Sequence, residues 1–184
     1  MKEVVMNEEE ILDTCKRLGF ALGSKLKNEE KLPVFLCVMK GALNFMADLI
    51  KQVKTDILCD YIQISSYEGT SSTGKIILKR DIEQDIEGRT VVVVEDVIDL
   101  GTTMKYLVEH LKQKNPKRVI VCALFDKKVN RISDVKIDYV GKVLDENKFL
   151  VGYGLDYNGL LRNVPYVYIP DEEEIKRLDE KLAK

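Results

Sequence analysis

The sequence predicts an α/β protein whose mainly parallel, twisted sheet is flanked by helices. Between residues 7 and 124, apolar runs typical of strands alternate with segments of helical periodicity. One run contains four consecutive valines, as expected of a strand that is covered on both faces. Strands that alternate with helices favour a parallel sheet with right-handed crossovers, and ligands then bind beyond the carboxyl ends of the strands.

The first elements follow from local signals. Asn7 and Glu10 have the spacing of a capping box, and apolar residues at helical spacing follow them. The apolar run 34–39 predicts a buried strand, and residues 43–50 predict a helix after a tight turn.

The middle of the chain continues this alternation. Residues 57–64 and 75–79 have strand composition, and the polar segment 68–74 between them predicts a mobile loop. The valine run at 90–95 and the apolar run at 118–124 predict two more buried strands. Apolar residues at helical spacing between these two runs predict a helix.

The last third of the chain is less regular. Residues 127–162 are aromatic and irregular, and residues 172–184 predict a charged helical tail. No internal repeat or low-complexity tract is present. We therefore expect a single domain over residues 1–184.

The composition fits this expectation. The chain has 184 residues, 45% hydrophobic and 33% charged, which is near the globular average. Lys and Arg total 29 against 31 Asp and Glu, and the net charge of -2 argues against a general electrostatic grip on nucleic acid. The acidic start and the lack of an apolar stretch of about 20 residues predict no membrane partner and a cytoplasmic location.

The four cysteines and the single histidine carry no chemistry by themselves. Cys15, Cys37, Cys59 and Cys122 form no CxxC pair, and three of them lie in apolar runs, so we expect reduced core residues. His110 falls in a helical pattern, which disfavours a Cys/His catalytic pair and favours a structural role.

The most informative stretch begins where the valine run ends. Glu95 and Asp96 adjoin the strand, and Asp99 follows in the turn before the next helix. Carboxylates at the mouth of an apolar strand lose hydration unless they meet a metal ion, a donor or a ligand. Each acid alone is better explained as a cap, Glu95 and Asp96 of the strand and Asp99 of the helix, but three in one strand-turn-helix unit favour a functional site.

Small residues complete this unit. Gly101, Thr102 and Thr103 lead into the helix, where free backbone N–H groups and the helix dipole can hold a phosphate. The absence of GxxxxGK[ST] and of GxGxxG argues against a P-loop NTPase and against a dinucleotide-binding protein. An acidic pair beside a phosphate cradle suits a phosphorylated sugar with a vicinal diol.

The segment 95–103 resembles the phosphoribosyl pyrophosphate (PRPP) signature of the type I phosphoribosyltransferases, and the resemblance extends over nearly the whole chain. It implies the fold of that family, with a small hood lobe over the site formed by N-terminal residues and roughly 145–184. It also implies a purine salvage transferase that moves 5-phosphoribosyl from PRPP to hypoxanthine or guanine, giving IMP or GMP and pyrophosphate. Mg²⁺ is the implied cofactor, and a homodimer or homotetramer the implied assembly.

The resemblance assigns the sugar-phosphate site to one continuous set: Glu95, Asp96, Asp99, Leu100, Gly101, Thr102 and Thr103. Glu95 and Asp96 would hold the ribose hydroxyls and the metal with its water, and Asp99 is the catalytic candidate beside N7 of the purine. Leu100 departs from the family pattern, which has Thr or Ser there. One hydroxyl contact to the 5'-phosphate is therefore expected to be missing.

Pyrophosphate contacts are implied at two places. Met39-Lys40-Gly41 resembles the family's pyrophosphate loop, with a non-proline cis peptide bond between Met39 and Lys40. Arg162 is similar to the residue that grips pyrophosphate, and Asp156 to a ligand of a second Mg²⁺ ion. From the residues alone, an ordinary turn and a turn-forming aspartate are the alternatives.

The purine site is implied by Lys127, Phe149 and Leu150. Lys127 is a pure donor that suits O6 of hypoxanthine or guanine and opposes the 6-amino group of adenine. Phe149 would stack on the base. Without the resemblance, Phe149 would be interpreted as core and Lys127 as a surface charge.

A lid is implied at Ser66 and Tyr67 together with residues 68–74, where an exposed hairpin is the alternative. Such a lid would exclude water, which competes as a nucleophile.

Three other functions fit parts of the sequence. A related transferase that prefers xanthine and guanine would share the motifs. A nucleotide-binding regulator of pyrimidine-gene transcripts would share the fold, but the net charge of -2 and the absence of a basic stripe disfavour RNA binding. A catalytically silent sheet protein need not keep Glu95, Asp96, Asp99, Lys127 and Arg162 together.

Overall fold

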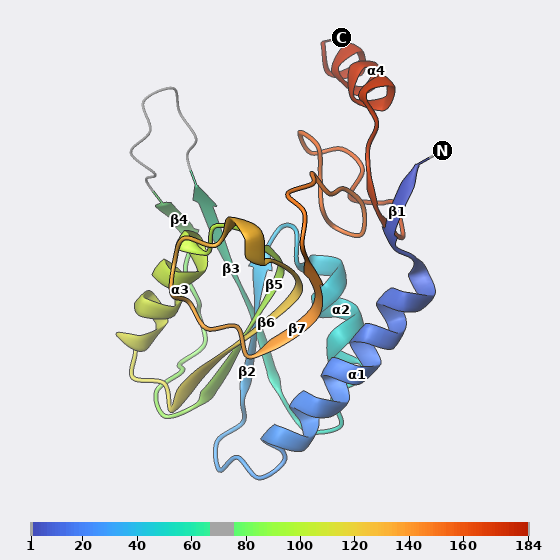
Figure 1. The fold of residues 1–184 in the computed structure, drawn as a ribbon. Coiled ribbons are helices and arrows are strands. Elements are labelled where there is room, and N and C mark those ends of the chain that lie inside the picture. The colour runs from blue at the N-terminus through green and yellow to red at the C-terminus, as the bar shows by residue number, and fades with distance from the viewer. Residues whose placement is uncertain (1, 67–75, 184) are drawn as a thin grey trace.

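The computed structural model describes residues 2–66 and 76–183, which form an α/β architecture (Figure 1). The strands are β1 (Glu3–Met6), β2 (Val34–Met39), β3 (Leu58–Ser66), β4 (Ile76–Arg80), β5 (Thr90–Ile98), β6 (Arg118–Lys127), β7 (Tyr139–Leu144) and β8 (Val167–Ile169). The helices are α1 (Glu8–Leu26), α2 (Leu43–Ile50), α3 (Thr102–Lys112) and α4 (Glu172–Leu182), with a 3-10 turn η1 at Lys128–Asn130.

A six-stranded sheet forms the centre, in the order β4-β3-β2-β5-β6-β7. All neighbouring strands in it are parallel except β3 and β4, which are antiparallel. The helices α1 and α2 cover one face and α3 covers the other (Figure 1). The predicted fold class is therefore confirmed.

The first helix begins as the sequence predicts. The N–H of Glu10 donates to Asn7 Oδ1 at 2.9 Å, and the N–H of Asn7 donates to Glu10 Oε2 at 2.8 Å. This capping box satisfies two N–H groups at the start of α1. The apolar face of α1, represented by Leu18 and Leu22, is buried against the sheet.

The valine strand β5 separates two cores. Val92 and Val94 pack on the side of α1 and α2, whereas Val91 and Val93 pack on the side of α3. The helix that follows β2 thus covers one face and the helix that follows β5 covers the other, although β2 and β5 are neighbours. Such a topological switch point is where ligands bind in open α/β sheets.

The two central strands part at this point. The last pair between β2 and β5 joins Cys37 to Val94. Beyond it, β2 stays paired with β3 as far as Met39, and β5 stays paired with β6 as far as Ile98. The sheet therefore opens directly in front of the acidic pair.

Several boundaries differ from the expectation. The strand β5 ends at Ile98 instead of residue 95, because pairing with β6 holds it through the acidic pair. The strand β7 lies in the segment that was expected to be irregular. It pairs with β6 on one side and forms the sheet edge on the other, so its residues are only partly buried and show no continuous apolar run.

A second, antiparallel sheet joins the two ends of the chain. It consists of β1 and β8, which are too short to give a periodic signal in the sequence. We call residues 2–6 and 145–183 the hood lobe. In Figure 1 this lobe lies beside the carboxyl ends of the central strands, and both termini belong to it.

The cysteine expectation is correct at three positions and wrong at Cys59, which is exposed. The edge strand β4 pairs only with residues 63–66 of β3, so β3 is itself an edge at Cys59. His110 lies on α3 with its Nε2 2.9 Å from Asp81 Oδ1, which agrees with a structural role. No helix in the described stretches is both long and apolar enough to span a bilayer.

Candidate active site

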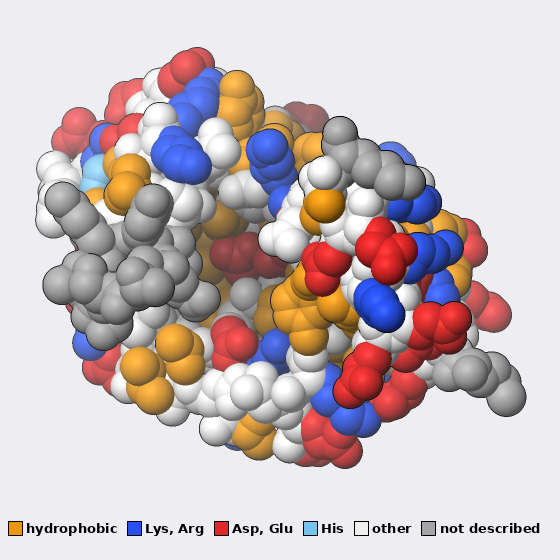
Figure 2. All heavy atoms as spheres, turned by 90° about the horizontal axis from the view of Figure 1, so that it is seen from above, with side chains coloured by type: hydrophobic (Ala, Val, Ile, Leu, Met, Phe, Trp, Pro, Cys, Tyr) orange, Lys and Arg blue, Asp and Glu red, His pale blue; other side chains and the backbone are white. Residues whose placement is uncertain are grey.

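The acidic pair lies beside the loop that follows β2. Seen from above, the molecule has a hollow between its two lobes, with acidic side chains on its floor (Figure 2). A Cβ placed on Gly41 would lie 1.7 Å from Asp96 Oδ2, so a larger residue here would force the carboxylate or the loop to move. The two segments predicted to hold pyrophosphate and ribose are therefore in direct contact.

Glu95 and Asp96 bind neighbouring main-chain groups. The N–H of Asp96 donates to Glu95 Oε1 at 3.0 Å, and the N–H of Val97 donates to Asp96 Oδ1 at 2.7 Å. Burial raises the pKa of Glu95 well above its ordinary value, and the charge of Asp96 raises it further. A cation or a hydroxyl donor placed here would favour the charged form of this carboxyl group.

The helix after β5 begins without a side-chain cap. Its N-cap is Gly101, in the left-handed region at φ 80°, and no side chain of residues 2–66 or 76–183 bonds the N–H groups of the first turn. The alternative that Asp99 caps this helix is therefore excluded. Free N–H groups at the start of an 11-residue helix, α3, can hold an anion, with Thr102 exposed and Thr103 half-buried beside them.

Asp99 faces residues at the end of β6 and in the turn that follows it. Asn130 donates from Nδ2 to Asp99 Oδ1 at 2.6 Å, and Lys127 Nζ lies 3.6 Å from Asp99 Oδ2. The Lys127 side chain is only 9% exposed, so it is not a surface charge. The structure thus brings the catalytic candidate and the predicted O6 donor together. Leu100, next in the chain, is exposed and has no hydroxyl to offer.

The loop after β2 has the predicted backbone. The peptide bond between Met39 and Lys40 is cis, which confirms the expectation, and Lys40 is exposed. The hood lobe sits directly on this loop, since a Cβ on Gly154 would lie 2.2 Å from the carbonyl oxygen of Gly41.

The predicted pyrophosphate and metal residues of the hood lobe bind each other. Arg162 donates from Nη1 to the carbonyl oxygen of Gly154 and from Nη2 to Asp156 Oδ1, both at 2.6 Å. Asp156 Oδ2 accepts from the N–H of Gly159 at 2.6 Å, which is also the bond of a turn former. A metal ion at Asp156 would therefore compete with Arg162 for Oδ1.

The predicted base-binding residues differ in exposure. Phe149 is 52% exposed and touches Tyr157 edge-on, with 6.1 Å between the ring centroids, so it is not a core residue. Leu150 is 5% exposed and packs in the core beneath α1 and α2. Its side chain therefore belongs to the core and does not line the hollow. Of the predicted lid, Ser66 ends β3, and Tyr67 and residues 68–74 lie outside the described residues.

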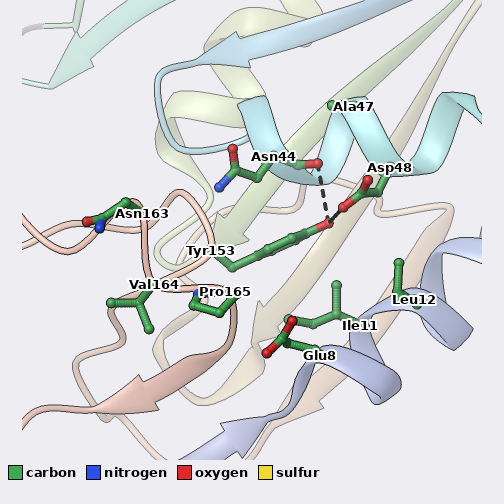
Figure 3. Close-up of a pocket in the computed structure, with 10 residues that line it drawn as sticks. All are labelled: Glu8, Ile11, Leu12, Asn44, Ala47, Asp48, Tyr153, Asn163, Val164 and Pro165. Carbon is green, nitrogen blue, oxygen red and sulfur yellow. Dashed lines mark hydrogen bonds between the residues drawn. The ribbon is translucent and has the colours of Figure 1, made fainter.

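Tyr153 was not predicted from the sequence. Its hydroxyl donates to Asp48 Oδ2 at 2.7 Å and to the carbonyl oxygen of Asn44 at 3.3 Å, across a cavity of about 330 Å³ between α1, α2 and the hood lobe (Figure 3). Asn44 also donates to the carbonyl oxygen of Arg162 at 3.3 Å. These bonds tie the hood lobe to the helix that follows the cis peptide.

The donor set fits a magnesium ion that is held largely by a substrate. Among residues 2–66 and 76–183, no group of three His, Cys, Asp or Glu side chains is arranged to hold a metal ion. Glu95 and Asp96 nevertheless supply carboxylate oxygens side by side at the switch point. Mg²⁺ typically binds one or two carboxylates and completes its shell with water and phosphate oxygens.

Comparisons with known proteins agree with this geometry. The phosphoribosyl transferase domain model matches residues 7–158. The chain therefore belongs to the phosphoribosyltransferase family.

The names of similar proteins indicate one group within this family. The hypoxanthine-guanine phosphoribosyltransferase of Streptococcus thermophilus (strain CNRZ 1066) is 40% identical over 174 residues, covering 94% of this chain and 95% of the relative. A crystal structure of a hypoxanthine phosphoribosyltransferase from Staphylococcus aureus superposes with a TM-score of 0.88 and 38% identity, over 94% and 93% of the two chains. The hypoxanthine phosphoribosyltransferase of Trypanosoma cruzi in complex with the product IMP gives a TM-score of 0.86 and 28% identity, over 93% and 95%.

Proposed function

We propose that this chain transfers the 5-phosphoribosyl group of PRPP to hypoxanthine or guanine, giving IMP or GMP and pyrophosphate. One observation carries the proposal. At the switch point of the sheet, Glu95, Asp96 and Asp99 lie next to a helix start that has no side-chain cap. Relatives that are about 40% identical over 94% of the chain carry the corresponding name.

The sugar-phosphate half of the site follows from its donors and acceptors. The N–H groups at the start of α3 hold the 5'-phosphate, and the carboxylates of Glu95 and Asp96 accept hydrogen bonds from the ribose hydroxyls. When bound, Mg²⁺ neutralises the pyrophosphate leaving group and orients it. Lys40, with the main chain of the cis loop, and Arg162 add donors for the same anion.

The base half follows from Asp99 and Lys127. Asp99 accepts a hydrogen bond from N7–H of the purine, which orients the ring. It takes this proton as N9 bonds to C1' of ribose and the bond from C1' to the pyrophosphate oxygen breaks. Lys127, 3.6 Å from this carboxylate, donates to O6. Adenine would place its 6-amino group against this donor and leave a buried polar group unpaired, so it is rejected. The exposed ring of Phe149 covers the base.

A panel of four bases tests this function. We expect hypoxanthine and guanine to release pyrophosphate from PRPP, and adenine to release none. Removing Mg²⁺ with EDTA should abolish the release. Preference for xanthine over hypoxanthine would assign the chain to the related xanthine-guanine transferases. If no base releases pyrophosphate and the protein binds RNA saturably at physiological salt, a nucleotide-binding regulator of pyrimidine-gene transcripts is favoured.

A substitution at Leu100 is expected to strengthen PRPP binding. Leu100→Thr restores a hydroxyl beside the 5'-phosphate and is expected to lower the KM for PRPP by about 3- to 10-fold, the value of one good hydrogen bond. Steady-state kinetics with PRPP varied at saturating hypoxanthine measures it. Leu100→Val, which shortens the side chain without adding a hydroxyl, is the matched control and should not improve KM.

The remaining assignments rest on the family likeness. We propose that the hood lobe closes over the base, that Asp156 ligates a second Mg²⁺ ion, and that the chain forms a homodimer or homotetramer. Light scattering after size-exclusion chromatography measures the assembly. A cytoplasmic location remains a prediction.

A further inference from the structure

Three consecutive carbonyl groups, at the end of β5 and in the loop after it, are held from one side. Arg131 donates from Nε to the carbonyl oxygen of Asp99 at 3.0 Å and from Nη2 to that of Ile98 at 3.3 Å. The next carbonyl oxygen, of Leu100, accepts from the N–H groups of Ile132 at 3.2 Å and of Ser133 at 3.3 Å. Segment 131–133 thus binds the carbonyl oxygens of residues 98, 99 and 100.

This arrangement fixes where the N–H groups of the loop point. In a trans peptide unit the C=O and the following N–H point in opposite directions. Holding the carbonyl groups of residues 98–100 toward segment 131–133 therefore turns the N–H groups of residues 99–101 to the other side of the loop. Successive N–H groups directed to one side, ahead of a helix start, form an anion-binding concavity.

Arg131 is itself firmly anchored. Its Nη2 lies 2.5 Å from Asp126 Oδ1, and the two side chains are only 15% and 10% exposed. Asp126 belongs to β6 and precedes Lys127. The loop also lies tightly on this side chain, because a Cβ on Gly101 would lie 2.8 Å from Arg131 Cδ. The guanidinium group thus links the loop to the sheet.

We propose that Arg131 is a positioning residue for the ribose 5'-phosphate: it holds the loop carbonyl groups so that the opposite N–H groups face the phosphate. The bonds of its guanidinium group go to the loop and to Asp126, so it acts without touching the substrate. This role rests on the proposed function. Leu100 has no hydroxyl, so at this position the loop can offer a phosphate only its main-chain N–H group.

The test compares IMP with inosine, which differ only by the phosphate. Arg131→Met removes the donors and keeps much of the apolar length. It is expected to weaken IMP binding by about 10- to 100-fold while inosine binding changes by less than about threefold, both measured by calorimetry or by competition. Arg131→Lys, which keeps the charge but not the planar fork, should fall between Arg131→Met and the wild type.

Lys105→Met is the matched control, because it removes one positive charge near the same loop. Lys105 pairs with the exposed Asp134, so the ratio of IMP to inosine affinity should stay within about twofold of wild type. Should Arg131→Met fail to fold, IMP and inosine binding are compared in Arg131→Lys and Asp126→Asn. Each of these variants is expected to lose less IMP affinity than Arg131→Met.

The outcomes separate the two proposals. An Arg131 variant that keeps the wild-type ratio, or that weakens both ligands equally, overturns the positioning role while the wild-type transferase assay still supports the function. A wild-type protein that binds IMP no better than inosine and releases no pyrophosphate overturns both.

Discussion

Replacing Asp99 by asparagine is expected to lower kcat by about 10²- to 10⁴-fold and to change PRPP affinity by less than about fivefold. The amide keeps the shape of the carboxylate but cannot accept the purine proton. It also leaves Lys127, 3.6 Å away, without a charged partner. Steady-state kinetics with each substrate varied separates the two parameters.

The control for this variant is Asp134→Asn. Asp134 is exposed, follows segment 131–133 and pairs only with Lys105 among the described residues, so its loss should leave kcat unchanged. If Asp99→Asn turns over at the wild-type rate, Asp99 takes no part in the chemistry and its contacts with Asn130 and Lys127 are structural.

The second large effect is expected at the loop after β2. Gly41→Ala places a methyl group 1.7 Å from Asp96 Oδ2, so either the loop or the carboxylate must move. Both are parts of the proposed PRPP site, and a displacement of about 1 Å can cost about 10²-fold in rate. We expect kcat/KM for PRPP to fall by about 10²-fold or more, measured at saturating hypoxanthine.

Gly88→Ala is the matched substitution far from the hollow. Gly88 has a φ of 69°, and the nearest atom to an added Cβ is the flexible end of Lys31 at 3.3 Å. This variant should lose about 1 kcal/mol of stability through backbone strain and keep its kcat/KM. Gly41→Ala with wild-type kcat/KM would show that the contact between the loop and Asp96 is dispensable.

Much of the fold was predictable because its signals are local. The capping box of α1, the strand at 34–39 and the valine run each depend on residues close in sequence. The cis bond at Met39 is confirmed as well, although only the family likeness predicted it. The strands β1, β7 and β8 were missed because short or edge strands need no continuous apolar run.

The residues that hold the site residues in place were harder to predict from the sequence. Asn130 and Arg131 contact Asp99, although more than 30 positions separate them in the chain. The pairing of β5 with β6 places the segments that follow these two strands side by side. No motif marks an asparagine or an arginine in a turn as a partner of a distant loop. Tyr153 was missed for the same reason, since its partner Asp48 lies on α2.

Individual roles within the site remain predictions. The structure brings Lys127 to Asp99 and pairs Asp156 with Arg162, and the substrate contacts of these four residues were predicted from the family likeness.

A crystal grown with PRPP and Mg²⁺ examines the central assignment most directly. We expect density for the 5'-phosphate on the N–H groups of residues 99–103 and for the ribose hydroxyls on Glu95 and Asp96. Clear density for PRPP elsewhere, for example in the cavity beside Tyr153 (Figure 3), with residues 95–103 free of ligand, would contradict it.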